Sequence, residues 1–331
     1  MSFKPIAVVT GGAGFIGSHM VDLLLERGFR VHVIDNLVGG NLLNLGHHKS
    51  NQDVVFEQKD IRSYAEDDSL FKNARYVFHF AGIGDIVPSI EHPKEYLSVN
   101  VQGTVNIVQC ALSAGVEKIV YAASSSCYGQ ADTPTREDNS ISTLYPYALS
   151  KYMGEQVLFH WHQVYKLPVN SIRIFNAYGT RSRTSGAYGA VFGVFLKQKL
   201  ADKPFTVVGD GTQRRDFLYV TDVVKAFFAA ANTDRVGQVY NLGAGAPQSV
   251  NRLVELLGGE VVYIPKRPGE PDCTHADITK ITSQLDWKPE VSFEEGVKHL
   301  LMDINYWRDA PLWDEASIAD ATQTWFKYLA S

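Results

Sequence analysis

The chain has 331 residues, with 31 basic and 36 acidic side chains and a formal net charge of −5. This balance argues against a nucleic-acid-binding protein, which normally needs a basic stripe to displace counterions. Hydrophobic residues make up 45% of the chain, as in ordinary globular proteins, and no apolar run reaches the roughly 20 residues of a membrane span.

Short apolar runs alternate with helical patterns along the first 175 residues. Strand-like runs lie at 6–9, 31–34, 54–56, 76–80, 119–121 and 169–175. Helical patterns cover 15–27, 99–114 and 147–165, and Gly115 is expected to end the second of them. Continuous apolar strands separated by helices predict a parallel sheet that is covered on both faces. The right-handed crossover rule then predicts a doubly wound α/β fold.

The pattern loosens after about residue 176, where proline and glycine punctuate shorter elements, as at Pro204, Gly209-Asp210-Gly211 and 265–269. We therefore expect a domain over residues 1–175 that binds a dinucleotide. Residues 176–331 are expected to form mainly a smaller substrate-binding lobe, with some segments returning to the first domain.

A glycine-rich turn follows the first strand and opens the first helix. Gly11, Gly14 and Gly17 allow a tight turn and close approach of the backbone to a pyrophosphate at the helix N-terminus. Asp35 ends the second strand 18 residues later, where a carboxylate binds the adenosine ribose hydroxyls and repels a 2′-phosphate. The pattern favours NAD over NADP. The alternative is an ordinary turn with a solvated aspartate, and Asn36 could equally be a turn residue.

A second group of residues points to proton transfer. Tyr147 and Lys151 are four residues apart, so on a helix they share one face, and Ser124 ends a strand at the sheet edge where such folds bind ligands. A tyrosine is a poor base at neutral pH, but a nearby ammonium and a nicotinamide cation favour its phenolate. These three residues are the predicted catalytic group.

The sequence resembles the extended short-chain dehydrogenase/reductase enzymes that act on nucleotide sugars. The resemblance covers nearly the whole chain, and its matching segments are TGGAGFIGSH (10–19), Asp35-Asn36, Asp60-Ile61, Phe80-Ala81-Gly82, Asn100, Ser124-Ser125-Ser126, Tyr147-x-x-x-Lys151, Arg173-x-Phe175-Asn176-x-Tyr178-Gly179, Gly209-Asp210-Gly211-x-x-x-Arg215-Asp216-Phe217 and Arg267-Pro268-Gly269-Glu270.

The resemblance implies a Rossmann fold, bound NAD and a nucleotide-diphosphate sugar as substrate. It places at the cofactor Gly11, Gly14, Phe15, Ile16, Gly17, Asp35, Asn36, Asp60, Ile61, Phe80, Ala81, Gly82, Asn100, Tyr147, Lys151 and Phe175. It places at the substrate Ser125, Ser126, Asn176, Arg215, Arg267 and Glu270. The arginines also suit a diphosphate on physical grounds, because guanidinium forks match phosphate oxygens; the alternative for each is a solvated surface charge.

The residues after Ser124 bear on the reaction. The family's 4,6-dehydratases carry an Asp-Glu pair there, and its uronic acid decarboxylases usually keep a glutamate where Ser126 stands. Ser125 and Ser126 cannot titrate, so the triple serine resembles the 4-epimerases and favours a UDP-hexose 4-epimerase. A nucleotide-sugar 4-dehydrogenase or 4,6-dehydratase that releases a 4-keto sugar stays the alternative, while a catalytically silent binding module is disfavoured by the intact catalytic group.

Three residues have two interpretations each. Asp85, in a segment that departs from the typical epimerase pattern, is either an added acid/base or a turn residue, and the turn is favoured. Cys127 is expected to be a small buried hydrophobe, and His79 a core histidine with satisfied hydrogen bonds.

The three cysteines, Cys110, Cys127 and Cys273, are far apart and predict neither a disulfide framework nor a metal site. The N-terminus lacks the pattern of a secretory signal, so the cytoplasm is the expected compartment. The helices at 99–114 and 147–165 carry wide apolar faces. By resemblance they form a homodimer interface, and the alternative is burial within one chain.

Overall fold

Seven parallel strands form the main sheet, in the order β11-β6-β5-β4-β1-β2-β3. The strands are β1 (Ile6–Thr10), β2 (Arg30–Asp35), β3 (Val54–Gln58), β4 (Ala74–His79), β5 (Lys118–Ser124), β6 (Val169–Ile174) and β11 (Gln238–Leu242). The structure is a computed structural model that describes residues 4–182 and 191–329. It confirms the predicted doubly wound α/β fold.

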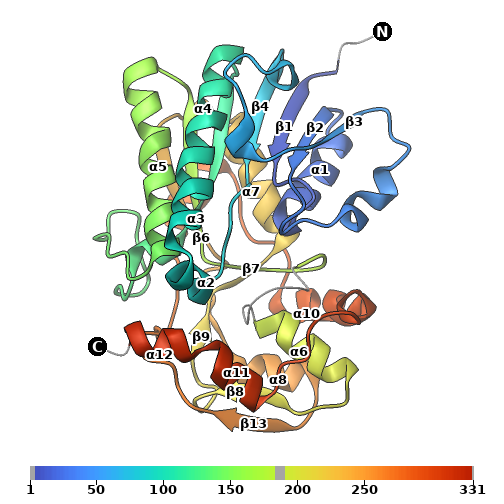
Figure 1. Cartoon of the computed structure of the whole chain (residues 1–331), viewed down its shortest axis with the longest axis vertical. Coiled ribbons are helices and arrows are strands. Elements are labelled where there is room, and N and C mark those ends of the chain that lie inside the picture. The colour runs from blue at the N-terminus through green and yellow to red at the C-terminus, as the bar shows by residue number, and fades with distance from the viewer. Residues whose placement is uncertain (1–3, 183–190, 330–331) are drawn as a thin grey trace.

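Helices cover both faces of this sheet (Figure 1). The main covering helices are α1 (Phe15–Glu26) and α7 (Val220–Asn232) on one face and α4 (Gly103–Ala114) and α5 (Pro146–Tyr165) on the other. Side chains alternate along each strand, so that Val9 packs with α1 and α7 whereas Val8 packs with α4 and α5. Both valines are fully buried, which is why the strands are apolar throughout.

The predicted helix ends agree closely with the structure. Gly115 adopts a left-handed backbone with φ +63° directly after α4, as expected for a helix-ending glycine. The start of the predicted 99–114 helix is a π-helical turn, Ser98–Gln102. α5 begins one residue early, at Pro146, because proline suits the first helical position.

The smaller lobe has a core of its own, centred on the fully buried Trp307. Its elements are α6 (Val191–Leu200), β8 (Phe205–Val208), β9 (Arg214–Arg215), β12 (Gln248–Ser249), α8 (Val250–Leu257), β13 (Val261–Ile264), α10 (Phe293–Met302), α11 (Glu315–Ala321) and α12 (Gln323–Leu329). Two short parallel strands, β7 (Asn176–Tyr178) and β10 (Phe217–Tyr219), pair between the main sheet and this lobe. Figure 1 shows the lobe below the sheet, with the C-terminal helices crossing beneath α2 (Ile86–Glu91).

Late segments of the chain return to the main sheet. β11 pairs with β6 at the sheet edge, and α9 (Thr279–Leu285) contributes Ile281 and Leu285 to the core beneath α7. The domain boundary at 175/176 stays a prediction. None of the described helices combines the length and apolarity that a membrane crossing requires.

His79 and Cys127 are as predicted. Thr10 Oγ1 and Thr104 Oγ1 hydrogen bond with the two ring nitrogens of the fully buried His79, at 2.6 and 3.0 Å. Cys127 is 2% exposed, and burial raises the pKa of its thiol to about 12. Neither side chain is therefore available for acid/base work near neutral pH.

Candidate active site

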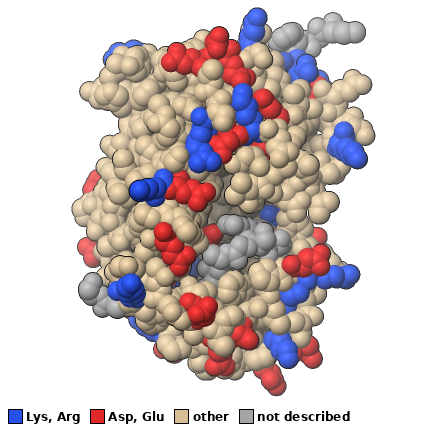
Figure 2. Space-filling view, viewed as in Figure 1, with Lys and Arg blue, Asp and Glu red and all other residues tan. Residues whose placement is uncertain are grey.

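The carboxyl ends of the parallel strands meet at one edge of the sheet. Strand order reverses at β1, because β2 lies on one side of it and β4 on the other, and such switch points are where doubly wound sheets bind ligands. A cleft of about 460 Å³ opens there, and Figure 2 shows the surface hollowed at the waist between the two lobes. The predicted residues that line this cleft are Gly11, Gly14, Phe15, Ile16, Gly17, Asp35, Asn36, Ile61, Phe80, Ala81, Gly82, Ser124, Tyr147, Lys151 and Phe175.

The glycine-rich turn leaves no room for side chains. A Cβ on Gly17 would lie 2.1 Å from the carbonyl oxygen of Gly11, and Gly11 itself has φ +69°. α1 begins at Phe15 after Gly14, and no side chain caps its first amides, so these amides face the cleft side of the turn ready for an anion. This cradle fits the pyrophosphate of a dinucleotide.

Asp35 is held at the end of β2 by two backbone amides. Its carboxylate accepts hydrogen bonds from Ala13 N at 3.0 Å and Leu37 N at 2.8 Å. Burial raises its pKa. Because each carboxylate oxygen has a second lone pair, the group can still accept hydrogen bonds from ribose hydroxyls.

Two predicted cofactor residues support the cleft without lining it. Asp60 accepts a hydrogen bond from Asn36 Nδ2 at 3.0 Å and binds Arg62 through both oxygens, and the bonds from Arg62 are the main reason that the pKa of Asp60 falls to about 2. Asn100 is 1% exposed and bonds the backbone of Ile83 through both its amide atoms, at 2.8 and 3.0 Å. Both side chains hold neighbouring groups of the cleft, and their roles at the cofactor stay predictions.

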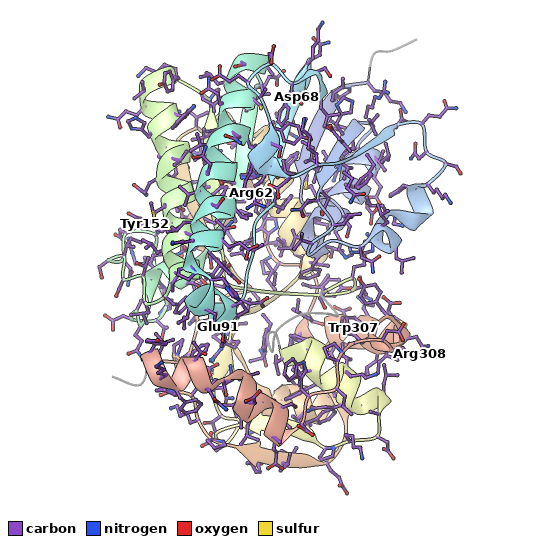
Figure 3. The ribbon with its side chains drawn as sticks, in the orientation of Figure 1. Arg62, Asp68, Glu91, Tyr152, Trp307 and Arg308 are labelled. Atoms are coloured by element: carbon purple, nitrogen blue, oxygen red, sulfur yellow. The ribbon has the colours of Figure 1, made fainter. Side chains whose placement is uncertain are left out.

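The sequence analysis missed several lining residues. The lining of the cleft also includes the charged residues Lys59, Arg62 and Glu95 (Arg62 is labelled in Figure 3) and the small residues Ala122 and Ala123. The alanines directly precede Ser124, so their small size at a strand end was a usable signal. The three charged residues follow no local pattern in the sequence, because the fold brings them together from separate segments.

Ser124 and Tyr147 form the centre of the predicted catalytic group. Ser124 ends β5 and lines the cleft together with Tyr147, which lies one turn before Lys151 on α5. The Lys151 ammonium lies 4.5 Å from the centre of the Tyr121 ring and the residue is 7% exposed. Burial lowers the pKa of Lys151 to about 7, against the opposing charge of Glu155. Burial therefore makes the ammonium form of Lys151 less favourable than it is in water.

The environment of Tyr147 favours the neutral phenol in this structure. Burial is the main cause that raises its pKa, the hydrogen bond from Ser124 opposes this, and the negative charge of Asp85 adds to it. Burial therefore opposes the phenolate that Lys151 is expected to stabilise. The positively charged nicotinamide ring of bound NAD is expected to favour the phenolate as well.

Asp85 combines a backbone role with a place in the cleft. It has φ +74° at the residue before α2, makes no side-chain cap to that helix, and lines the cleft. The backbone of Asp85 fits the favoured interpretation as a turn residue. Its carboxylate also acts on the catalytic group, because its negative charge raises the pKa of Tyr147.

A second cleft, of about 490 Å³, lies in the smaller lobe and contains Arg215, Glu270 and Lys266 in its lining. Glu270 pairs with Arg215 Nη2 at 2.6 Å and with Arg267 Nε at 3.7 Å. The structure therefore brings three predicted substrate residues into one charged group.

The other predicted substrate residues lie apart from this charged group. Asn176 is half-buried and accepts a hydrogen bond from Thr274 Oγ1 at 2.7 Å. Ser125 and Ser126 form the turn after β5 and are in the lining of neither cleft.

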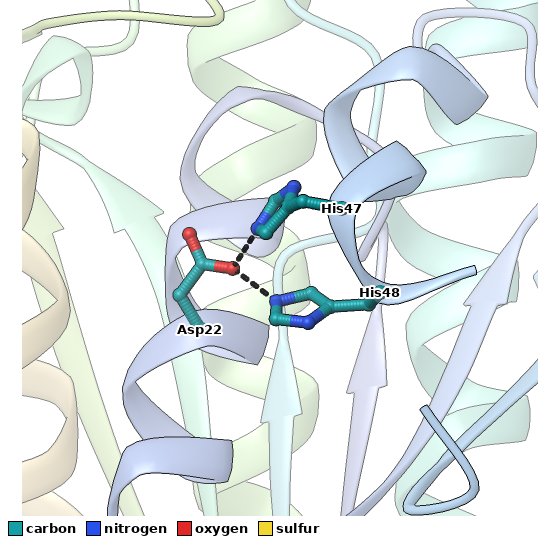
Figure 4. A group of neighbouring side chains, drawn as sticks. All are labelled: Asp22, His47 and His48. Carbon is teal, nitrogen blue, oxygen red and sulfur yellow. Dashed lines mark hydrogen bonds and ion pairs between the residues drawn. The ribbon is translucent and has the colours of Figure 1, made fainter. Parts of the chain in front are cut away.

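A separate polar cluster joins α1 to the 3-10 helix Leu42–His48 (Figure 4). His47 and His48 donate through Nε2 to one oxygen of Asp22, at 2.8 and 2.6 Å, and Arg181 pairs with the other oxygen at 2.7 Å. The side chains of Asp22, His47 and His48 lie close enough together to hold a metal ion. Because the guanidinium already neutralises the carboxylate, the cluster is best explained as a polar clamp between segments distant in sequence.

Comparisons with known proteins identify the family of this chain. The profile of the NAD dependent epimerase/dehydratase family matches residues 7–243. The chain belongs to this family. A putative UDP-glucose 4-epimerase of Methanocaldococcus jannaschii is 37% identical, over 89% of this chain and 96% of its own. The UDP-glucose 4-epimerase of Mycolicibacterium smegmatis is 34% identical, over 88% and 95%.

A solved structure extends the family comparison. The UDP-glucuronic acid 4-epimerase from Bacillus cereus, crystallised with UDP-glucuronic acid and NAD, superposes with a TM-score of 0.85 at 29% identity, covering 91% of this chain and 99% of that one. The predicted resemblance is therefore confirmed, and the protein is an NAD-dependent enzyme of the epimerase/dehydratase type within the extended short-chain dehydrogenases/reductases. The roles of individual site residues stay predictions.

Proposed function

We propose that this enzyme is a 4-epimerase of nucleotide-diphosphate sugars, of the UDP-hexose type. Bound NAD supplies the acceptor and donor of hydride at C4 of the sugar. Tyr147 removes the proton from the C4 hydroxyl and later returns it. The O4–H and C4–H bonds both break and both re-form, with hydrogen added to the opposite face of C4, so the reaction has no net oxidation.

The meeting of Ser124, Tyr147 and Lys151 in the lining of one cleft, with Lys151 one turn after Tyr147 on α5, is the observation that carries the proposal. Ser124 orients the phenol towards its substrate oxygen. Lys151 in its ammonium form stabilises the phenolate by charge. Proton transfer at one oxygen needs no further acid, which is what distinguishes epimerisation from elimination.

The lining of the cleft also bears on the alternative reactions. A 4,6-dehydratase needs an acid and a base beside the sugar, and the acidic residues known to line this cleft are Asp35, Asp85 and Glu95. Of these three, Asp85 is the one whose negative charge raises the pKa of Tyr147, so it is the carboxylate we propose would act with Tyr147 in an elimination. A 4-keto-6-deoxy product would therefore implicate Asp85.

The charged cleft of the smaller lobe is proposed to hold the substrate diphosphate. Arg215 and Arg267 would bind phosphate oxygens, Glu270 would hold both arginines and contact the nucleoside ribose, and Asn176 would contact the diphosphate. Ser125 and Ser126 would contact the sugar next to Tyr147. UDP is the proposed nucleotide because the named relatives above act on or bind UDP-sugars.

The proposal is tested with purified protein and UDP-hexoses that differ at C4. We expect the C4 epimer as product, no lasting rise in absorbance at 340 nm, and NAD retained through purification. A stable rise with a 4-keto sugar would instead establish the 4-dehydrogenase. A 4-keto-6-deoxy sugar without that rise would establish the dehydratase. A thermal-shift screen of UDP, GDP, dTDP and CDP tests the nucleotide independently.

A cytoplasmic homodimer is the proposed working form. Two free cysteines are buried, as suits a reducing compartment, and α5 exposes apolar side chains, with Leu149 40% and Met153 39% exposed. A face of α4 and α5 that packs against a second copy would cover them. Light scattering at micromolar concentration should give a dimer, and a monomer would remove this part of the proposal.

A further inference from the structure

The short helix α12 is held by one deeply buried aromatic side chain. Trp325 is 6% exposed, whereas Phe326 and Tyr328 on the same helix are 39% and 57% exposed. α12 has only seven residues, and helices much shorter than about 12 residues are not stable alone. Trp325 therefore anchors the helix, and its contacts show what the helix is anchored to.

α12 contacts both parts of the molecule. Thr324 Oγ1 donates to Glu91 Oε1 of α2 at 2.9 Å, beside the main sheet. Trp325 Nε1 donates to the carbonyl oxygen of Pro268 at 2.7 Å, in the smaller lobe. Figure 1 shows α12 directly beneath α2, and Figure 3 shows Glu91 on the side of α2 that faces it.

Trp325 also touches the charged group proposed for the diphosphate. The guanidinium of Arg267 lies 5.6 Å from the centre of the indole ring, which is cation–π distance. The same arginine pairs with Glu270, and Glu270 pairs with Arg215. Trp325 thus packs against one end of a row of three charged side chains.

The other side of Trp325 leads to the catalytic helix. Its ring centre lies 6.5 Å from that of Tyr145, and the Tyr145 ring is parallel to that of Tyr147, with centres 6.5 Å apart. An aromatic row therefore connects α12 to the proposed base. Trp325 is placed where the charged cleft and the catalytic group approach each other.

We propose that Trp325 is a positioning residue for substrate binding, an inference that rests on the proposed function. The indole fixes Arg267 through its ring and the 267–270 segment through its N–H. An arginine side chain loses considerable rotamer freedom when it binds a ligand, so holding it in place beforehand strengthens binding. α12 in this way makes the far C-terminal segment part of the nucleotide-sugar site.

The test compares Trp325→Ala with Phe326→Ala, an exposed aromatic on the same helix. For Trp325→Ala we expect the Kd for UDP and the KM for UDP-hexose to rise about 10-fold, as for loss of a partly desolvated cation–π contact with its packing. The kcat and the bound NAD should stay within about 3-fold, because the chemistry is untouched. Phe326→Ala should change neither constant by more than about 2-fold.

A conservative variant and a double-mutant cycle sharpen the result. Trp325→Phe keeps a ring face for Arg267, so it should retain most of the UDP affinity that Trp325→Ala loses. It lacks the indole N–H, so any remaining loss reports the hydrogen bond to Pro268. In an Arg267→Ala background, Trp325→Ala should have almost no further effect on the Kd for UDP. If Trp325→Ala does not fold, the same cycle is run with Trp325→Leu, which fills apolar space but offers Arg267 no ring face.

Two results would overturn the inference while leaving the proposed function intact. One is wild-type and Trp325→Ala protein that bind UDP equally. The other is additive losses in the cycle, which would show that Trp325 acts independently of Arg267. Wild-type protein that binds no UDP would instead overturn the proposed UDP specificity.

Discussion

The two clefts differ in how they manage charge. The cleft on the sheet is built from glycines, small apolar residues and buried titratable groups, and burial shifts the pKa values of Tyr147 and Lys151 in opposite directions. The cleft in the smaller lobe is lined by charged side chains such as Arg215 and Glu270, which pair with each other. Burial makes the pKa values of groups that transfer protons responsive to nearby charges, whereas a dianion is best bound by cations that can release an anionic side chain and bind phosphate oxygens in its place. The comparison predicts that substitutions in the first cleft change turnover or cofactor binding and those in the second change substrate affinity.

The largest effect is expected for Tyr147→Phe. Removing the general base should lower kcat by at least about 10²-fold, with NAD still bound, because the ring itself remains. Steady-state rates and the NAD content of the purified variant measure both. A rate near that of the wild type would contradict the proposal that the first cleft carries out the proton transfer.

Gly17→Ala tests the cradle of the first cleft. The added methyl group would lie 2.1 Å from the Gly11 carbonyl oxygen, so the turn must shift, at a cost of roughly 1–3 kcal/mol. We expect loss of co-purified NAD and a lower melting temperature. Gly46→Ala is the matched control, since a Cβ there meets nothing within 4 Å; equal behaviour of the two variants would disprove the tight approach.

Arg215→Ala tests the second cleft. Loss of a charged hydrogen-bond partner should raise the KM for the nucleotide sugar by about 10-fold or more while kcat changes little. Arg252→Ala is the control, because Arg252 belongs to the same lobe and pairs at the surface with Glu255 and Glu294. A drop in kcat at constant KM would remove Arg215 from the diphosphate site.

The smallest effect is expected for Asp85→Asn. The negative charge of Asp85 helps to raise the pKa of Tyr147, so its removal should lower that pKa. Because the phenolate is the active form, the acid limb of the kcat profile should move to lower pH. Asp138→Asn, at an exposed site paired with Arg136, should leave the profile unchanged. An unshifted or upward-shifted limb for Asp85→Asn would show that its charge does not reach the phenol.

Local patterns predicted the first cleft better than the second. The glycine spacing, Asp35 at a strand end and the four-residue separation of Tyr147 and Lys151 each reflect one element, so they are visible in sequence. α2 was not predicted, because Gly84 and Pro88 interrupt its apolar pattern. The contact of Trp325 with Arg267 joins residues far apart in the chain and has no period to reveal it.

The effect of Asp85 on Tyr147 was likewise hidden from the sequence. Whether a carboxylate faces a turn or a catalytic group depends on where the fold brings its backbone, and here a left-handed residue before α2 sets that direction. Sequence therefore predicts which residues carry the chemistry, while the structure is needed to show which residues adjust it.

The most direct test follows the hydrogen at C4. A UDP-hexose deuterated at C4 is incubated with the NAD-containing enzyme in ordinary water, and the product is examined by NMR. We expect the C4 epimer with its deuterium retained, because hydride held by the cofactor does not exchange with solvent. Loss of the label from C4, or inversion at any other carbon, would contradict a 4-epimerase that works by oxidation and return of hydride.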